Sequence, residues 1–306
     1  MNMKASKAQD LRIVFMGTPE FATATLAKIW NAGYEVVGVI TAPDRPAGRG
    51  RKLQESDVKK YAVEKGVKVL QPTNLKNQKF LEELKSLNAN LQIVVAFRML
   101  PKSVWSMPKL GTFNLHASLL PDYRGAAPIN WAIMNGETES GATTFFIDDK
   151  IDTGEIILQE KIGIATNDNA GILHDKLMNL GANLVLQTLE QIAQGSVKTR
   201  KQSKTSNLKE AHKIFKDTCK IDWSDSLAVI HNKIRGLSPY PSAWTSLVNG
   251  DESLTVKIYS AFKEEMENTH EIGSIHFEGK KLKVAVHQGY VRVINKYGDL
   301  PLFYLC

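Results

Sequence analysis

Two short segments of the sequence carry the polar side chains that a reaction at a carbonyl group needs. Asn114 and His116 lie two residues apart in the stretch Thr112–His116, where polar and apolar residues alternate. This alternation predicts a β-strand, and on a strand both side chains point to the same face. Asp152 lies in the second segment, Lys150-Ile-Asp-Thr-Gly154. Because the ends of neighbouring parallel strands meet at one edge of a sheet, we expect Asp152 to lie close to His116.

These three side chains predict acid–base chemistry. A carboxylate beside an imidazole orients the ring and lets the pair carry a proton, while the Asn amide and a protonated His donate hydrogen bonds to a developing oxyanion. The sequence has neither a Ser–His–Asp nucleophile pattern nor the spacing of metal ligands, so we expect direct transfer through a tetrahedral intermediate and no metal. Asp148 and Asp149, in the same loop, remain alternatives to Asp152. The competing interpretation is a buried strand whose Asn and His bond only to nearby backbone.

The elements expected to position these residues form a Rossmann-like α/β fold. Leu11–Met16 is a short buried strand, a helix follows it, and Tyr34–Ile40 is a second strand. The turn between the first strand and the helix has one glycine instead of a G-x-G-x-x-G pattern, which argues against a dinucleotide cofactor. Leu91–Phe97 is another buried strand, and we expect its end to lie beside the end of the strand that carries His116. The predicted sheet is mostly parallel.

A basic linker separates this domain from a second, smaller one. Residues 169–194 form a long amphipathic helix, after which the chain loses its periodicity and becomes rich in Lys, Ser and Thr. Beyond the linker, short alternating segments separated by Gly or Asn turns are typical of antiparallel strands. We therefore predict three parts: a Rossmann-like domain over 1–200, the linker over 201–213 and a small antiparallel OB-like β-barrel over 214–306.

The composition is typical of a globular protein of the cell interior. The 306 residues exceed one typical core, and the 43% hydrophobic and 23% charged content are ordinary. The two cysteines, Cys219 and Cys306, fit neither a disulfide framework nor a metal or redox motif. The sequence has no signal-type apolar core and no apolar run long enough to cross a membrane. We expect a cytoplasmic protein without a membrane partner.

Basic charge is concentrated in two segments. The chain carries a net charge of +7, and residues 198–220 hold eight Lys or Arg against Glu210 and Asp217. The second segment is the Gly- and Pro-rich loop 41–53, where only Asp44 opposes four basic residues, Arg45, Arg49, Arg51 and Lys52. This concentration predicts a large polyanionic partner. The alternative for 198–220 is a linker kept in solution by its lysines.

Three motifs, in this order, resemble those of the 10-formyltetrahydrofolate-dependent formyltransferases: Asn114-Leu-His116, Ser118-Leu-Leu-Pro121 and Ile151-Asp-Thr-Gly154. The resemblance implies the formyltransferase fold, 10-formyltetrahydrofolate as the donor and tetrahydrofolate as the product. It also implies that Asn114, His116 and Asp152 are the catalytic residues. The residues that it implies for folate binding are Phe97, Arg98, Met99, Leu100, Ser118, Leu119, Leu120, Pro121 and Asp149.

A longer set of motifs is similar to the members of that family that act on methionyl initiator tRNA. The matching segments lie between about residues 10 and 290: Gly17-Thr-Pro-Glu-Phe21, Pro43-Asp-Arg-Pro-Ala-Gly-Arg-Gly50, Tyr123-Arg-Gly-Ala-Ala-Pro-Ile129, Ile221-Asp-Trp223, Arg235 and Pro239-Tyr-Pro-Ser-Ala-Trp244. The resemblance implies formyl transfer to the methionyl α-amino group, which supplies formylmethionyl-tRNA for translation initiation. It implies that loop 41–53 enters the acceptor-stem major groove and that the tRNA contacts include Arg45, Arg49, Arg51, Lys52, Lys209 and Lys213.

Alternatives to this interpretation remain. The nearest is a folate-dependent formyltransferase that acts on a small amine, such as a ribonucleotide or an amino-sugar, and that needs no basic loop. A non-catalytic RNA-binding protein on the same fold and a formyl-folate hydrolase are further alternatives. Residues 296–306 depart from the family pattern, because they lack its basic terminal segment. We expect a monomer.

Overall fold

The computed structural model describes residues 10–47, 52–203 and 207–294, and their contacts form two compact units. The first unit runs to Arg124 and includes residues 141–162 and 175–209. The second contains residues 125–140 and 163–174 and continues from Glu210. The predicted limits 1–200, 201–213 and 214–306 stay predictions. Within the described residues, no helix is both long and apolar enough to span a bilayer.

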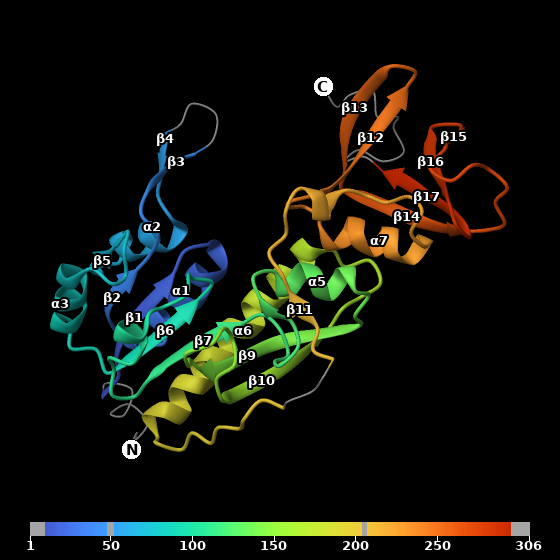
Figure 1. Ribbon diagram of the computed structural model, residues 1–306. Coiled ribbons are helices and arrows are strands. Elements are labelled where there is room, and N and C mark those ends of the chain that lie inside the picture. The colour runs from blue at the N-terminus through green and yellow to red at the C-terminus, as the bar shows by residue number, and fades with distance from the viewer. Residues whose placement is uncertain (1–9, 48–51, 204–206, 295–306) are drawn as a thin grey trace. The chain divides into compact units, whose positions relative to one another are not determined.

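A seven-stranded sheet forms the centre of the first unit (Figure 1). Strand β1 pairs in parallel with β2 and β6, β2 pairs in parallel with β5, and β6 pairs in parallel with β7. Strand β9 is antiparallel to β7. This arrangement confirms the mostly parallel sheet. In spatial order the strands are β10 (Ile156–Gly163), β9 (Glu139–Phe146), β7 (Thr112–His116), β6 (Leu91–Val95), β1 (Arg12–Gly17), β2 (Glu35–Ile40) and β5 (Val69–Leu70).

Helices connect the parallel strands, and their apolar residues form the core with the central strands. Every residue of β6 is buried, as expected for a strand covered on both faces. Two of the connecting helices begin with a side-chain cap, since Ser56 accepts from the amide of Lys59 and Asn77 accepts from that of Phe80. The helices of this part of the chain are α1 (Glu20–Asn31), α2 (Asp57–Glu64), α3 (Gln78–Ser86), α4 (Lys102–Trp105) and α6 (Ala170–Ala193).

The loop predicted over 41–53 contains a short antiparallel ribbon, which the sequence analysis missed. Strands β3 (Arg45–Ala47) and β4 (Lys52–Gln54) pair with Arg45 opposite Gln54. Asp44 anchors the base of the ribbon: its carboxylate accepts hydrogen bonds from Lys59 and from Gln71. Proline and glycine suggested an irregular loop, but a two-stranded ribbon consists of edge strands only, where proline is tolerated. Residues 48–51 lie outside the described residues.

The second unit contains an antiparallel β domain, as predicted for the C-terminal part of the chain. Strands β12 (Ala243–Asn249) and β13 (Glu252–Ile258) form a hairpin. A four-stranded sheet has the order β14 (Ser260–Glu265), β17 (Gly289–Ile294), β16 (Lys281–Val286) and β15 (Ile275–Glu278). Its apolar residues pack with helix α7 (Leu227–Gly236), which also contacts α5 (Pro128–Met134).

His231 on α7 makes the stability of the second unit dependent on pH. Burial lowers its pKa, and the charges of Arg235 and Lys263 lower it further, against a hydrogen bond with the backbone of Ala261. Between the lowered folded pKa and the unfolded pKa of about 6.5, the unfolded chain therefore binds a proton that the folded chain does not. The stability contributed by neutral His231 is complete above that pH and is lost as the pH falls from there through the folded pKa.

We expect the melting temperature of the protein to fall more than that of His231→Gln between about pH 7.5 and about pH 5.5. Calorimetry of the two proteins at both pH values measures the difference. Equal falls would contradict the assignment of this pH dependence to His231.

Candidate active site

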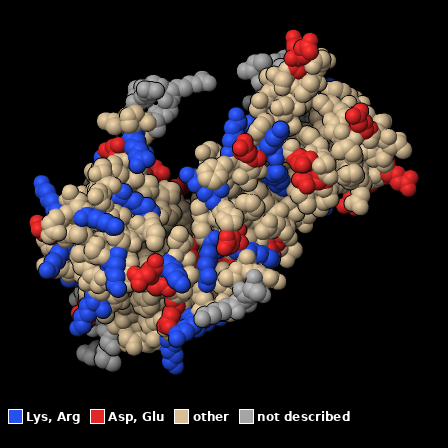
Figure 2. Space-filling model, viewed as in Figure 1, with Lys and Arg blue, Asp and Glu red and all other residues tan. Residues whose placement is uncertain are grey.

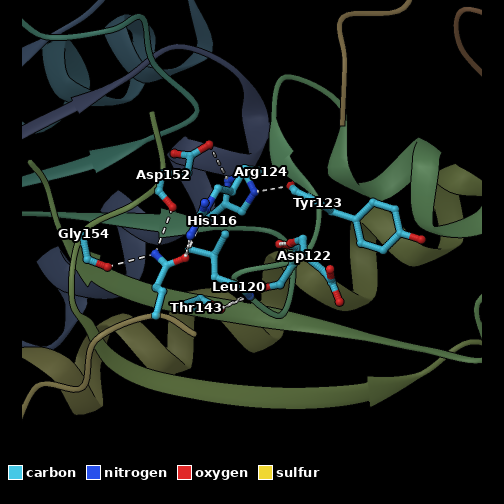
Figure 3. A network of polar contacts seen from close by, with 10 residues as sticks. His116, Leu120, Asp122, Tyr123, Arg124, Thr143, Asp152 and Gly154 are labelled. Carbon is cyan, nitrogen blue, oxygen red and sulfur yellow. Dashed lines mark hydrogen bonds and ion pairs between the residues drawn. The ribbon is translucent and has the colours of Figure 1, made fainter. Parts of the chain in front are cut away.

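Strand β7 presents Asn114 and His116 at its carboxyl end, within the first unit. His116 is buried, and its Nε2 lies 2.8 Å from the carbonyl oxygen of Tyr123 (Figure 3). A carbonyl oxygen only accepts hydrogen bonds, so Nε2 must carry the proton of this contact. The Tyr123 carbonyl therefore fixes the ring and leaves Nδ1 as the nitrogen available to other groups.

Asp152 faces that second nitrogen. Its Oδ2 lies 3.8 Å from Nδ1 of His116, and both side chains are largely shielded from water. This distance permits electrostatic attraction but exceeds that of a hydrogen bond. The two groups therefore lie together as predicted, and Nδ1 keeps hydrogen-bonding capacity for a reacting oxygen.

The route by which Asp152 reaches His116 differs from the prediction. We expected the ends of two parallel strands, but β9 is antiparallel to β7 and its last residue, Phe146, pairs with Phe113 near the start of β7. Strand β9 thus ends at the opposite end of β7 from His116. The loop 147–155 turns back to carry Asp152 to the imidazole. The alternation of polar and apolar residues within one β-strand does not reveal this reversal, because it does not show whether the strand runs parallel or antiparallel to its neighbour.

The other two acids of the loop have different environments. The carboxylate of Asp148 accepts hydrogen bonds from the Lys150 amide and from the Thr153 hydroxyl, and so it shapes the loop. Asp149 is exposed. Of the three candidate acids, Asp152 is the one paired with His116.

Asn114 supplies a polar atom without a hydrogen-bond partner. Its Oδ1 is buried, and no group within the described part of the chain bonds to it. Leaving a buried acceptor unsatisfied costs about 1–3 kcal/mol, so native structures keep such groups mainly where a ligand or a reaction uses them. The orphaned oxygen beside His116 marks a place for a ligand.

A glutamine from a distant segment holds the Asp152 loop. Nε2 of Gln202 donates to the carbonyl oxygens of Asp152 and Gly154, each at 2.9 Å. Its Oε1 accepts from the guanidinium of Arg124, at 3.1 Å from Nε. Gln202 therefore joins the loop that carries Asp152 to the residue that follows Tyr123.

Comparison with known proteins identifies the family. Two family profiles match the chain, Formyl transferase over residues 11–189 and Formyl transferase, C-terminal domain, over 213–296. The chain is 57% identical to the methionyl-tRNA formyltransferase of Flavobacterium johnsoniae, over 94% of the chain and 91% of that protein. The protein of the same name from Bacteroides fragilis is 54% identical over the same shares. This chain belongs to the methionyl-tRNA formyltransferase family.

The fold of this formyltransferase also agrees with solved structures. An N-formyltransferase from Helicobacter canadensis, solved with folinic acid and dTDP-3-aminofucose, superposes with a TM-score of 0.67 at 22% identity. The alignment covers 92% of this chain and 98% of that one. At this identity the likeness shows a shared fold. The resemblance found in the sequence motifs is thus confirmed at the level of family and fold.

The Ser-Leu-Leu-Pro loop of the formyltransferase uses part of its polar groups internally. Ser118 is fully buried, and its hydroxyl donates to the carbonyl of Asp122 at 2.6 Å. Leu120 is also buried, and its amide bonds to the Thr143 hydroxyl. Leu119 and Pro121 are partly exposed. We therefore expect Ser118 and Leu120 to shape this loop, and the two partly exposed side chains to border a ligand.

The segment after β6 offers polar backbone groups at the expected folate site. Within the described residues, no backbone hydrogen bond uses the N–H groups of Phe97, Arg98 or Met99. Met99 is 66% exposed, whereas Leu100 is buried in the core. The Arg98 guanidinium donates to the carbonyls of Pro72 and Thr73, which holds the segment in place. This part of the formyltransferase combines apolar side chains with amides that are unused by the described backbone.

The six residues expected to contact tRNA have different environments in the formyltransferase. Arg45 is exposed on β3. Lys209 and Lys213 lie over the rings of Tyr123 and Phe215, at 6.0 and 5.5 Å from the centroids. Arg49, Arg51 and the side chain of Lys52 lie outside the described residues. Basic side chains are spread over the visible surface of both units, with acidic ones among them (Figure 2).

Sequence reasoning missed two contributors to the site, the Tyr123 carbonyl and Gln202. Every residue has a backbone carbonyl, so the residue type at 123 gives no sign that this carbonyl bonds to His116. Gln202 lies 50 residues beyond Asp152 in a stretch without periodicity, so spacing gave no signal. A polar uncharged residue among the basic residues of the linker was the only available clue.

Proposed function

We propose that this formyltransferase moves the formyl group of 10-formyltetrahydrofolate to the α-amino group of methionine on initiator tRNA. The observation that carries the proposal is the arrangement at the end of β7. There His116 is fixed by the Tyr123 carbonyl and faces Asp152, and the buried oxygen of Asn114 has no hydrogen-bond partner among the described residues. The identity of more than half of the sequence to methionyl-tRNA formyltransferases supports the tRNA acceptor.

In the proposed reaction the neutral amine attacks the formyl carbon. A C–N bond forms to the methionyl nitrogen, and the carbonyl oxygen becomes an oxyanion. This oxyanion accepts hydrogen bonds from the Asn114 amide and from Nδ1–H of a doubly protonated His116, whose Nε2–H stays bonded to the Tyr123 carbonyl. Asp152 keeps His116 oriented and takes the amine proton, directly or through water. The bond from the formyl carbon to the folate nitrogen then breaks, and that nitrogen receives the proton.

The residues near the site fit a folate. A pterin has an aromatic ring with a polar edge. The segment after β6 contains both the side chains of Phe97 and Met99 and backbone amides that make no backbone hydrogen bond among the described residues. Leu119 and Pro121 supply apolar contacts on the other segment. When bound, 10-formyltetrahydrofolate supplies the activated formyl group. The chain supplies its binding, its orientation and the movement of the proton.

The acceptor distinguishes this proposal from the small-amine alternative. The protein is incubated with 10-formyltetrahydrofolate and, in separate reactions, with methionyl initiator tRNA, an amino-sugar nucleotide and a ribonucleotide amine. Of the three acceptors, we expect only methionyl initiator tRNA to give rapid formation of tetrahydrofolate. Rapid turnover with either small amine, and none with the tRNA, would contradict the proposal.

Arg45 tests the role of the ribbon. The side chain is exposed beside a segment with further basic residues, so we expect Arg45→Ala to raise KM for tRNA while kcat changes little. If Arg45 neutralises one phosphate, the slope of log affinity against log salt should fall by about 0.9. Lys76→Ala, at an exposed site on another loop, is the control. An unchanged salt slope together with an unchanged KM would exclude a contact between Arg45 and the tRNA.

A further inference from the structure

Gln202 lies at a point where three parts of the first unit meet. Its amide nitrogen bonds to two carbonyls of loop 147–155, and its amide oxygen bonds to Arg124 (Figure 3 shows Arg124, Asp152 and Gly154 together). The planar side-chain amide thus uses both its nitrogen, as a donor, and its oxygen, as an acceptor. A glutamine is the residue type that can donate twice and accept at once from this position.

The segment that carries Gln202 is fixed to the body of the first unit. Arg200 and Ile156 exchange two backbone hydrogen bonds of 2.9 Å, which pairs residue 200 with the start of β10. The Thr199 hydroxyl donates to the carboxylate of Glu155 at 2.5 Å. The backbone just before Gln202 is therefore held against the start of β10, and this fixes the position from which the Gln202 side chain contacts the loop.

The loop needs such support at Asp152. This residue has φ of +54°, in the left-handed region that costs energy for a residue with a side chain. A conformation of this kind persists only when surrounding contacts determine it. The carbonyl that Gln202 holds belongs to Asp152 itself, and the second belongs to Gly154, two residues on. The two hydrogen bonds therefore fix the peptide group that follows Asp152 and the backbone at Gly154, and through them the direction of the Asp152 carboxylate.

We infer that Gln202 is a positioning residue for Asp152: it keeps the carboxylate directed at Nδ1 of His116 during formyl transfer. This inference rests on the role proposed above for Asp152. Gln202 bonds to backbone atoms of the loop and to Arg124, and it acts on the reaction through Asp152. Arg124 orients the Gln202 amide, so that Nε2 and not Oε1 points to the two carbonyls.

Two variants separate hydrogen-bond donation from the other properties of the side chain. Gln202→Glu keeps the shape and the partner for Arg124, but it replaces both donors with an oxygen that repels the two carbonyls. Gln202→Met keeps the length and removes both donors and the acceptor without introducing a charge. Gln78→Glu is the matched control, because it makes the same chemical change at an exposed position on α3.

Single-turnover formylation of methionyl initiator tRNA, with the protein and 10-formyltetrahydrofolate both in saturating excess over the tRNA, measures the effect. A misplacement of about 1 Å costs about 10²-fold in rate, so we expect Gln202→Glu and Gln202→Met to lower the rate by roughly that factor. The KM values for folate and tRNA should stay within about twofold, because the carboxylate contributes mainly to the chemical step. Amide exchange should rise in 147–155 and not in the central strands, and Gln78→Glu should match the unchanged protein.

The outcomes separate this inference from the proposed function. Normal rates in Gln202→Met together with a large loss in Asp152→Asn would overturn the positioning role and leave the function intact. A normal rate in Asp152→Asn would overturn the role proposed for Asp152 and with it the positioning role, whereas no formylation by the unchanged protein would overturn the proposed function. A lower rate that is explained entirely by a smaller folded fraction, with unchanged exchange in 147–155, would also overturn the positioning role.

Discussion

Asp152→Asn is expected to lower kcat for formyl transfer by about 10²-fold to 10⁴-fold, the range for loss of one acid–base group. The amide has nearly the size of the carboxylate, but it neither takes the amine proton nor balances a charged imidazole. The loop should stay in place, because Gln202 holds its backbone and not the Asp152 side chain. Steady-state formylation of methionyl initiator tRNA measures kcat.

The control for this variant is Asp149→Asn in the same loop. Asp149 is exposed, whereas Asp152 lies 3.8 Å from His116, so the same substitution should lower kcat strongly at Asp152 and change it little at Asp149. We expect Asp149→Asn to keep kcat within about threefold, and any effect at this position to fall on KM for folate. A loss of kcat at Asp149 as large as that at Asp152 would contradict the assignment of the base.

Asn114→Leu is expected to stabilise the protein while it removes most of the activity. Oδ1 of Asn114 is buried and has no partner in the part of the chain that the structure describes. Leucine of similar shape removes this unsatisfied acceptor, which should raise the free energy of unfolding by about 1 kcal/mol. Loss of one oxyanion donor should lower kcat by about 10²-fold to 10³-fold. Urea unfolding and formylation assays of the same preparation measure both effects.

Asn114→Leu should raise the free energy of unfolding and lower kcat, and this combination distinguishes a catalytic role of Asn114 from a structural one. A variant that loses activity because its site is distorted should also lose stability. Asn135→Leu, a change of the same kind at the end of α5, should change kcat by less than about twofold. Normal activity in Asn114→Leu would show that the amide has no part in the chemical step.

The sequence predicted the parts of the site that depend on local patterning. Alternation over Thr112–His116 correctly placed Asn114 and His116 at the end of one strand, and the apolar runs correctly predicted a mostly parallel sheet. The motif order also predicted the family that the comparisons show. These features follow from strand periodicity and residue type, which a single sequence contains.

The features that escaped prediction depend on direction and on distant contacts. The residue pattern of strand β9 predicts a strand but not the direction in which it runs. The antiparallel pairing with β7 and the return of loop 147–155 therefore had no local signal. The ribbon at residue 45 depends on Asp44 meeting Lys59 and Gln71, which are distant in sequence. Gln202 meets Asp152 across 50 residues. Such contacts join segments that are far apart in the sequence, so local patterning does not predict them.

The measurement that tests the central claim most directly is formylation by the unchanged protein and by His116→Ala. Each is incubated with 10-formyltetrahydrofolate and either methionyl initiator tRNA or methionyl elongator tRNA, and acid-stable formylmethionine and tetrahydrofolate are quantified together. We predict equal amounts of both products with the initiator, little of either with the elongator, and a loss of about 10²-fold or more in His116→Ala. Undiminished formylation by His116→Ala, or tetrahydrofolate without formylmethionine, would contradict the account.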